Sequence, residues 1–431
     1  MENCHIMREV TIYGQSIRMA TPSPMMPMSQ LGGLADEARD TSSGSTELQQ
    51  MAETAQALMQ LARARALAPN MEKTTRALSL AELSDLLQVP RKTIEYAIQT
   101  KELPQGAISG RKRLFTLTEV EEFRKHFKRV PHRPPGTTAS IVGVANFKGG
   151  VGKTSTAVHF GQYLALRGYR VLMVDLDAQA SLTTLFGLLP DSDVPTETTA
   201  LPYFEGAVDT LAGSIRKTYW HGLDLIPANL ALYNAEFALA RRQNVESDFR
   251  FYAVLKEGLE TVSADYDVIV LDTPPALGFV TTNAMYAANG LVIPVTPAMM
   301  DFASAAQFFQ LLAEHVEVIN RHEGGEKRFR FVRLLVSKFE ANNKVHETIE
   351  EWIRQGFETA VIGKNMALSA ALRTGPELQT AYEMGAYIGD RRTLQRAMKF
   401  LDDVNEEIER LIRQQWAQEL RQRESNGVAA A

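Results

Sequence analysis

The stretch Lys148-Gly149-Gly150-Val151-Gly152-Lys153-Thr154-Ser155 decides the fold of this 431-residue chain. It follows Ser140–Ala145, an apolar and β-branched run that suits a buried strand, and it opens a helical pattern near Thr154. A glycine-rich loop between a strand and a helix is the context that a phosphate-binding P-loop requires. Its backbone N–H groups can turn toward an anion, and the helix N-terminus adds the positive end of a dipole. These eight residues therefore predict a nucleotide-binding loop.

Two residues of the loop have specific expected roles. Lys153 should contact the β- and γ-phosphates of a nucleoside triphosphate, and the Thr154 hydroxyl should ligate Mg²⁺. The match to G-x-x-x-x-G-K-[ST] is incomplete, because Phe147 stands where the first glycine is expected and a second lysine, Lys148, precedes Gly149. A chance glycine-rich turn is the alternative, but the acidic residues downstream agree with a nucleotide site.

Acidic residues follow two further strand-like runs. Asp175 and Asp177 lie at the end of the run Arg170–Asp175, and Asp272 follows the run Asp267–Leu271. The carboxyl ends of parallel strands line the crevice in which such folds bind ligands. We expect Asp272 to hold Mg²⁺ through water. The alternative is that these strand-end aspartates only cap the turns that follow them.

The sequence predicts an α/β fold around a doubly wound, mostly parallel P-loop sheet. Two more apolar runs, Leu291–Val295 and Phe331–Ser337, alternate with helical patterns. Near-continuous apolar strands separated by helices indicate a parallel sheet that is covered on both faces. A long charged helix is expected over Leu394–Arg423.

Composition excludes several classes of protein. The net charge is −5 and Cys4 is the one cysteine, so neither an intrachain disulfide nor a cysteine-based metal site can form. No run approaches the roughly 18 apolar residues of a membrane-spanning helix, and no basic and apolar leader stands at the N-terminus. These features favour a cytoplasmic protein.

The chain divides into five predicted segments. Residues 1–45, rich in Met, Pro, Ser and Gly, are expected to be disordered or loosely ordered. Residues 46–73 form an amphipathic helix that serves either packing or dimerisation. Residues 74–130 form a small domain, 131–139 a proline-rich linker, and 140–431 the nucleotide-binding domain with its C-terminal helix.

The small domain has the order of elements of a winged helix-turn-helix. Ser79–Leu87, capped by Ser79, and Arg91–Thr100 are two short helices, and Leu103–Phe115 contains two strands around a glycine turn. A further helix covers Thr118–Phe127, and the whole resembles a MerR-like winged helix. The alternative is a small helical domain with a solvated basic face. The cations expected to meet DNA phosphates are Arg91, Lys92, Arg111, Lys112 and Arg113.

The motifs KGGVGKTST, VLMVDLDAQASL and VIVLDTPPALG resemble the deviant Walker ATPases of the ParA and MinD group over roughly residues 140–415. The resemblance implies that Lys148 reaches the phosphates of a partner protomer in an ATP-bound homodimer. It also implies that Asp177 positions the attacking water, so that Lys148 and Asp177 are the catalytic residues, and that Asp175 supports the Mg²⁺ shell. Ala178 departs from the proline of many relatives, with little expected effect on the chemistry.

The stretches Pro297–Phe309 and Thr380–Trp416 resemble long ParA proteins of plasmid partition, including the RepA proteins of repABC replicons. That resemblance implies a cytoplasmic, nucleoid-associated ATPase that uses ATP and Mg²⁺, binds DNA without sequence preference, and is stimulated by a ParB-type partner. It also implies repression of its own operon through the winged helix. The candidates for nonspecific DNA contact are Lys338, Lys344, Lys364 and Arg373.

Two other functions compete with partition. A MinD-like ATPase that cycles on a membrane would use Ile408, Ile412 and Trp416, which share one side of the last helix. Acids and bases mix on the other side of that helix, so we expect no stable membrane association. A nucleotide-gated transcriptional regulator without a role in segregation is the second alternative.

Overall fold

The computed structural model describes residues 7–12, 15–20, 45–67, 73–100, 102–131, 133–323, 326–367, 379–384 and 391–428. The chain forms two compact units, residues 1–60 and residues 61–431, and each is described by itself. Within the described ranges, every helix is too short or too polar to cross a membrane.

The first unit contains a two-stranded antiparallel sheet. Its strands are β1 (Met7–Ile12) and β2 (Gln15–Ala20), and Met7 lies opposite Ala20. The sequence predicted no regular element in residues 1–45, so this sheet is a correction. Each strand has only six residues among Met- and Pro-rich sequence, which gave the alternating pattern little length to stand out. The other residues of that segment lie outside the described ranges, except Ser45, which begins helix α1 (Ser45–Leu67). Helix α1 spans most of the segment 46–73 that was predicted to be helical, and residues 68–72 of that segment lie outside the described ranges.

A seven-stranded sheet forms the centre of the second unit, in the order β12-β11-β6-β10-β7-β9-β8. All neighbouring strands are parallel except β8 and β9, which are antiparallel, so the predicted mostly parallel sheet is confirmed. The strands are β6 (Ser140–Val144), β7 (Val171–Asp175), β8 (Arg216–Lys217), β9 (Leu223–Ile226), β10 (Val268–Asp272), β11 (Gly290–Val295) and β12 (Phe331–Val336).

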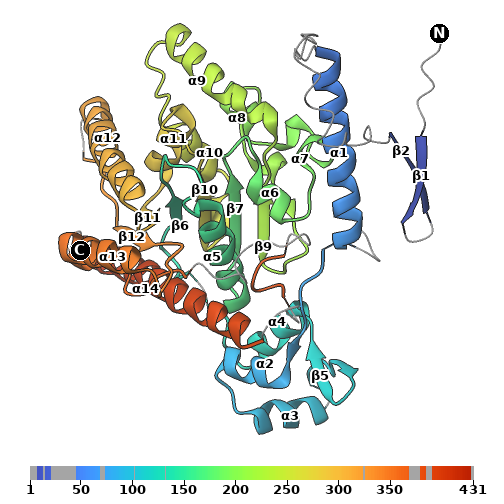
Figure 1. The fold of residues 1–431 in the computed structure, drawn as a ribbon. Helices are drawn as coiled ribbons and strands as arrows, with labels where there is room; N and C mark the ends of the chain where they lie inside the picture. The colour runs from blue at the N-terminus through green and yellow to red at the C-terminus, as the bar shows by residue number, and fades with distance from the viewer. Residues whose placement is uncertain are drawn as a thin grey trace, which may run out of the picture. The chain divides into compact units, whose positions relative to one another are not determined.

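Helices cover both faces of this sheet (Figure 1). Alternate strand residues such as Val142 and Met173 pack with helices α5 and α14, whereas Ile141 and Leu172 pack with α8 to α11. Helices α12 and α13 pack on β11 and β12. The helices are α5 (Lys153–Arg167), α6 (Ser181–Leu185), α7 (Pro190–Asp193), α8 (Leu201–Glu205), α9 (Asn234–Val245), α10 (Val254–Glu260), α11 (Phe279–Ala287), α12 (Met299–Glu323), α13 (Lys344–Phe357) and α14 (Arg391–Val428).

A smaller module precedes the sheet. It contains β3 (Leu78–Ser79), α2 (Leu80–Leu87), α3 (Arg91–Gln99), β4 (Ala107–Ser109), β5 (Lys112–Phe115) and α4 (Leu117–His126), and its three strands pair in the antiparallel order β3-β5-β4. Reciprocal side-chain and backbone hydrogen bonds cap α2 at Ser79 and Glu82, as the sequence predicted for Ser79. The rings of Phe115 and Phe123 meet edge to face in its core.

Buried cations attach this module to the sheet-containing part. The Lys73 ammonium donates to the carbonyl of Leu185, at 2.6 Å, and forms an ion pair with Glu383, at 2.9 Å. Burial lowers the pKa of Lys73 and raises the pKa of Glu383, and the attraction between the two charges offsets part of both shifts. Arg124 of α4 is also buried and donates to the carbonyl of Leu166 at the end of α5.

We expect Glu383→Ala to lower the free energy of unfolding by about 3–5 kcal/mol, because it leaves the Lys73 charge buried without its partner. Urea unfolding followed by tryptophan fluorescence measures the loss. The matched control is Asp403→Ala, which breaks the exposed pair with Lys399 and should cost about 1 kcal/mol or less. Equal losses in the two variants would contradict this account of the docking.

Candidate functional site

The loop between β6 and α5 has the geometry of a phosphate-binding loop. Gly150 and Gly152 have φ values of 74° and 94°, in the left-handed region where a Cβ atom would be strained. The loop borders a cavity of about 550 Å³. Its lining residues are Gly149, Gly150, Gly152, Lys153, Thr154, Ser155, Asp177, Gln179, Ser181, Thr184, Leu185, Pro275 and Lys338.

Lys153 brings a buried positive charge to this cavity. Its side chain belongs to the first turn of α5, and only 7% of the residue is exposed. The ammonium donates to the carbonyl oxygen of Lys148, at 3.1 Å. Burial lowers the pKa of Lys153, and the nearby carboxylates of Asp272 and Asp177 act in the opposite direction. Lys153 is therefore a cation held between acids, ready to bind an anion.

Asp272 is the acid best suited to a metal ion. It ends β10, is fully buried, and neither carboxylate oxygen makes a hydrogen bond of good geometry with the described residues. Burial and the neighbouring Asp175 raise its pKa well above the ordinary value, which Lys153 and the Thr154 hydroxyl partly offset. A buried carboxylate without a partner is costly unless a cation neutralises it. The oxygens of Thr154 and Asp272 are also the ligand type that Mg²⁺ prefers.

Both carboxylate oxygens of Asp175 accept hydrogen bonds from the protein. One carboxylate oxygen accepts hydrogen bonds from the backbone N–H and the hydroxyl of Thr183, at 2.9 and 2.7 Å, and the other accepts from the N–H of Asp177, at 3.2 Å. Burial raises the pKa of Asp175 to about 7. Since both oxygens already have protein donors, Asp175 orients the chain around Asp177 and is a weaker candidate for direct metal contact.

Asp177 lies at the wall of the cavity. It is partly exposed, and one of its carboxylate oxygens accepts the N–H of Gln179, at 2.9 Å. The backbone bond to Asp175 fixes the start of this turn. The structure thus brings Asp177, Lys153 and Thr154 to one cavity, as the sequence predicted, although Asp177 and Lys153 are 24 positions apart.

Lys148 lies outside the cavity that its own loop borders. Its ammonium forms an ion pair with Asp301 at the start of α12, and Lys148 is not among the residues that line the cavity in the described part of the chain. Within one protomer, the Lys148 ammonium is therefore not positioned to contact a nucleotide in this cavity. Val151 is buried and contributes its carbonyl to a hydrogen bond from the Ser337 hydroxyl, at 2.7 Å.

The structure adds cavity residues that the sequence did not indicate. Gln179, Ser181 and Thr184 belong to the turn after Asp177 and to α6, and Pro275 follows Asp272. The one feature of the sequence that could have indicated these residues is that they follow Asp177 and Asp272 closely along the chain. Lys338, predicted to contact DNA, lies at the wall of this cavity, where its charge is placed for an anion bound there.

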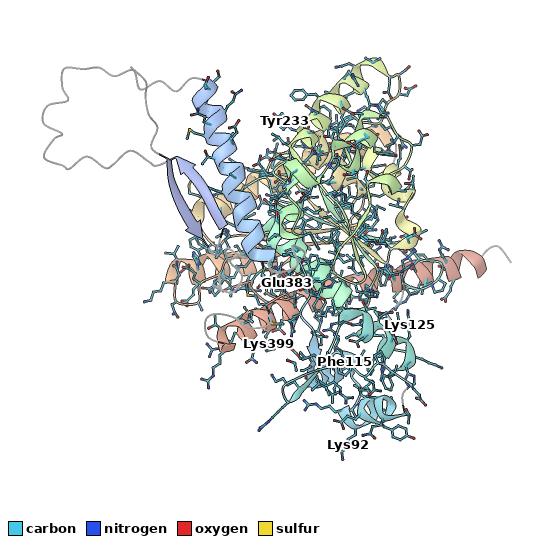
Figure 2. All side chains as sticks on the ribbon, turned by 90° about the vertical axis from the view of Figure 1, so that its right-hand side faces the viewer. Lys92, Phe115, Lys125, Tyr233, Glu383 and Lys399 are labelled. Atoms are coloured by element: carbon cyan, nitrogen blue, oxygen red, sulfur yellow. The ribbon has the colours of Figure 1, made fainter. Side chains whose placement is uncertain are left out.

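The basic residues of the small module border a second groove of about 590 Å³. Arg111, in the turn between β4 and β5, and Lys112 and Arg113, in β5, line it opposite α3. Arg91 and Lys92 are exposed in the first turn of α3. Figure 2 shows Lys92 pointing away from the module and Phe115 inside it. The predicted cations thus lie on α3 and on the adjoining hairpin, which is a surface suited to phosphates.

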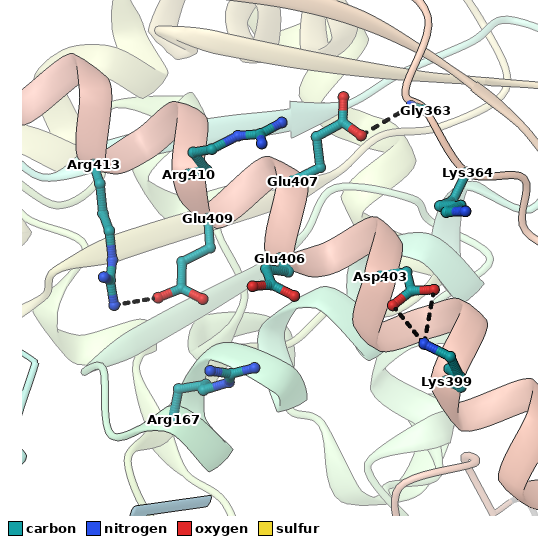
Figure 3. Close-up of a pocket in the computed structure, with 10 residues that line it drawn as sticks. All are labelled: Arg167, Gly363, Lys364, Lys399, Asp403, Glu406, Glu407, Glu409, Arg410 and Arg413. Atoms are coloured by element: carbon teal, nitrogen blue, oxygen red, sulfur yellow. Dashed lines mark hydrogen bonds and ion pairs between the residues drawn. The ribbon is translucent and has the colours of Figure 1, made fainter. Parts of the chain in front are cut away.

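The remaining candidates for DNA contact are scattered. Lys344 is exposed at the start of α13, and Arg373 lies outside the described residues. Lys364 borders a cavity of about 630 Å³ along α14, where acids and bases alternate (Figure 3). Several of these charges already have protein partners, including Arg413 with Glu409, at 2.6 Å. The structure therefore gathers no single basic surface from the described members of this set.

Comparisons with known proteins agree with this geometry. A family model described as an AAA domain matches residues 139–322. The chain is 36% identical to the putative replication protein A of Rhizobium rhizogenes over 368 residues, which cover 81% of this chain and 89% of that protein. It is 32% identical to protein SopA of Escherichia coli K12 over 362 residues, covering 81% of this chain and 92% of that protein.

A solved structure described as a partition protein has a similar fold. It aligns with a TM-score of 0.60 and 20% sequence identity, covering 85% of this chain and 98% of the other. At this level of identity the match supports the fold alone.

We expect Lys153→Ala to weaken the binding of a fluorescent ATP analogue by about 100-fold or more, because hydrogen bonds from a charged donor to phosphate contribute about 1.5–3 kcal/mol each. Fluorescence titration in the presence of Mg²⁺ measures the dissociation constant. Lys256→Ala, which removes a half-exposed lysine, should bind like the unmodified protein. Tight binding by Lys153→Ala would refute the assignment of the loop.

Proposed function

Because the chain belongs to the ParA family of partition ATPases, we propose that it partitions a plasmid or secondary replicon through an ATP-bound homodimer. The different positions of two lysines support this proposal. Lys153 faces the cavity, whereas Lys148 of the same loop lies outside it. A lysine that its own cavity does not use is available to a second protomer. Hydrolysis then depends on dimerisation, since the trans lysine would neutralise charge that develops in the transition state.

The residues of the cavity would have separate roles in ATP hydrolysis. Lys153 and the glycine-rich backbone would hold the phosphates, and Thr154 and Asp272 fit the Mg²⁺ that accompanies ATP and neutralises phosphate charge. Asp177 would orient the attacking water, and Asp175 would hold the turn that carries Asp177. Hydrolysis would be slow in the isolated protein, and we expect a ParB-type partner and DNA to stimulate it.

The small module would supply sequence-specific DNA binding. Its helices and hairpin have the order of a winged helix-turn-helix, and the groove lined by Arg111, Lys112 and Arg113 suits a phosphate backbone. This activity would repress the protein's own operon. Nonspecific DNA binding by the dimer would use exposed lysines such as Lys344 and Lys364, and it would place the protein on the nucleoid in the cytoplasm.

The last helix favours this function over a membrane-cycling ATPase. Ile408, Ile412 and Trp416 of α14 are buried against the sheet-containing part, and the Trp416 indole donates to the carbonyl of Thr138, at 3.0 Å. The apolar side of α14 is therefore already covered by protein and is not free to enter a lipid surface. A regulator without a role in segregation would share the DNA-binding module but would need no ParB-type partner.

We expect Asp177→Ala to bind ATP normally but to hydrolyse it at least about 100-fold more slowly, because a side chain that positions or deprotonates the nucleophile contributes about 10²–10⁴-fold. Phosphate release measures the rate of hydrolysis. Light scattering after gel filtration would reveal a dimer that persists with ATP. Asp191→Ala, which removes an exposed carboxylate on α7, is the control. Normal turnover in Asp177→Ala would remove this residue from the mechanism.

We expect the double variant Lys112→Ala, Arg113→Ala to weaken binding to operator DNA. The negative slope of log K against log salt should become shallower by about 2, because each missing cation leaves one phosphate without its neutralising partner. Fluorescence anisotropy at several salt concentrations measures both quantities. Lys217→Ala, which lies on β8 of the central sheet, is the control. An unchanged slope would argue against this groove as the DNA site.

A further inference from the structure

The ammonium of Lys148 already has a partner in the isolated protomer. It forms an ion pair with the carboxylate of Asp301, in the first turn of α12. About 32% of the Lys148 side chain and 18% of the Asp301 side chain are exposed. The pair is therefore neither fully buried nor freely solvated, and water can reach the lysine when the pair opens.

The backbone on the Lys148 side of this ion pair is fixed. The N–H of Lys148 donates to the side-chain oxygen of Asn146, at 3.1 Å, and the Asn146 amide donates to the carbonyl of Pro294, at 2.9 Å. Asn146 is buried, so these bonds tie the entry of the loop to β11. Only the flexible side chain of Lys148 is left to change its partner.

The Asp301 side is fixed as well. The N–H of Asp301 donates to the carbonyl of Ala298, at 3.0 Å, at the start of α12. The ring of Phe147, immediately before Lys148, packs on Phe308 of the same helix, with 5.9 Å between the ring centroids. Because both backbones are held, the ion pair forms between two prearranged groups.

We propose that Asp301 is a positioning residue that holds Lys148 in the free protomer and releases it when a second copy brings its bound triphosphate. This inference rests on the proposed function, in which Lys148 acts in trans. The lysine would exchange one carboxylate for several phosphate oxygens, which attract it more strongly than a single acid does. Asp301 would thus keep the lysine ordered and oppose dimerisation in the absence of nucleotide.

The neighbouring surface fits a second copy as the competing partner. Met299 and Met300 precede Asp301 and are 53% and 75% exposed. A partner protomer that docked there would cover these apolar side chains, which directly precede the residue that holds Lys148. The ion pair that must open is therefore next to two exposed apolar side chains, whose burial would favour dimerisation.

The size of the effect follows from the exposure of the pair. Partly exposed ion pairs change an equilibrium by about threefold. A symmetric dimer must open two of them, so the constants multiply. Removing the Asp301 charge should therefore strengthen dimerisation by about tenfold.

The test is the dimer dissociation constant of Asp301→Asn in saturating nonhydrolysable ATP analogue and Mg²⁺, measured by sedimentation equilibrium. Asparagine keeps the size of the side chain and removes its charge. We expect a dissociation constant about tenfold lower than that of the unmodified protein, and Asp301→Glu should restore the original value because it restores the charge. An unchanged or higher constant in Asp301→Asn would overturn the proposal.

A second measurement reports on the ion pair itself. In the nucleotide-free protein, the NMR signal of Lys148 after ¹³C-methylation of lysines, assigned with Lys148→Arg, should shift in Asp301→Asn, while the signal of Lys153 should not. A merely structural role of Asp301 in α12 would not move the Lys148 signal selectively, and an unmoved signal overturns the proposal. If the unmodified protein stays monomeric with the analogue, the proposed function fails first and the role of Asp301 fails with it.

Discussion

The site depends on a set of buried charged groups that the protein alone does not neutralise. The Lys153 ammonium lies near the buried carboxylate of Asp272 and the partly exposed carboxylate of Asp177, and Asp175 is a second buried acid next to Asp272. Burial lowers the pKa of the lysine and raises the pKa values of Asp175 and Asp272. Charges in such surroundings are costly without partners, and a triphosphate with its metal ion supplies both signs that the site lacks. The fold thus holds a site that favours its ligand.

The sheet explains why these groups meet. Asp175 and Asp272 are paired in register on the neighbouring parallel strands β7 and β10, and the loop that leads to Lys153 follows β6 on the other side of β10. All three strands point the same way, so their carboxyl ends share one edge. The sequence predicted this because near-continuous apolar strands with helices between them admit few other arrangements.

The prediction failed where the sequence signal was short or distant. The last two strands at one end of the sheet, β9 and β8, were missed because they have four and two residues, and Asp224 interrupts the apolar pattern of β9. The ion pairs of Lys148 with Asp301 and of Lys73 with Glu383 join residues more than 150 positions apart. No local sequence pattern predicts such pairs, since only folding brings the two residues together. For the same reason the sequence could not distinguish Asp175, which has protein donors, from Asp272, which lacks them among the described residues.

The proposed mechanism requires Lys148 to complete the site of another protomer, and mixing two inactive variants shows whether it does. Lys148→Ala retains Asp177, and Asp177→Ala retains Lys148, so a mixed dimer contains one complete site. Random mixing makes half of the dimers mixed, and we predict that the ATPase rate recovers to about a quarter of the unmodified rate. A mixture as inactive as its two components, although both fold and bind ATP, would contradict the account.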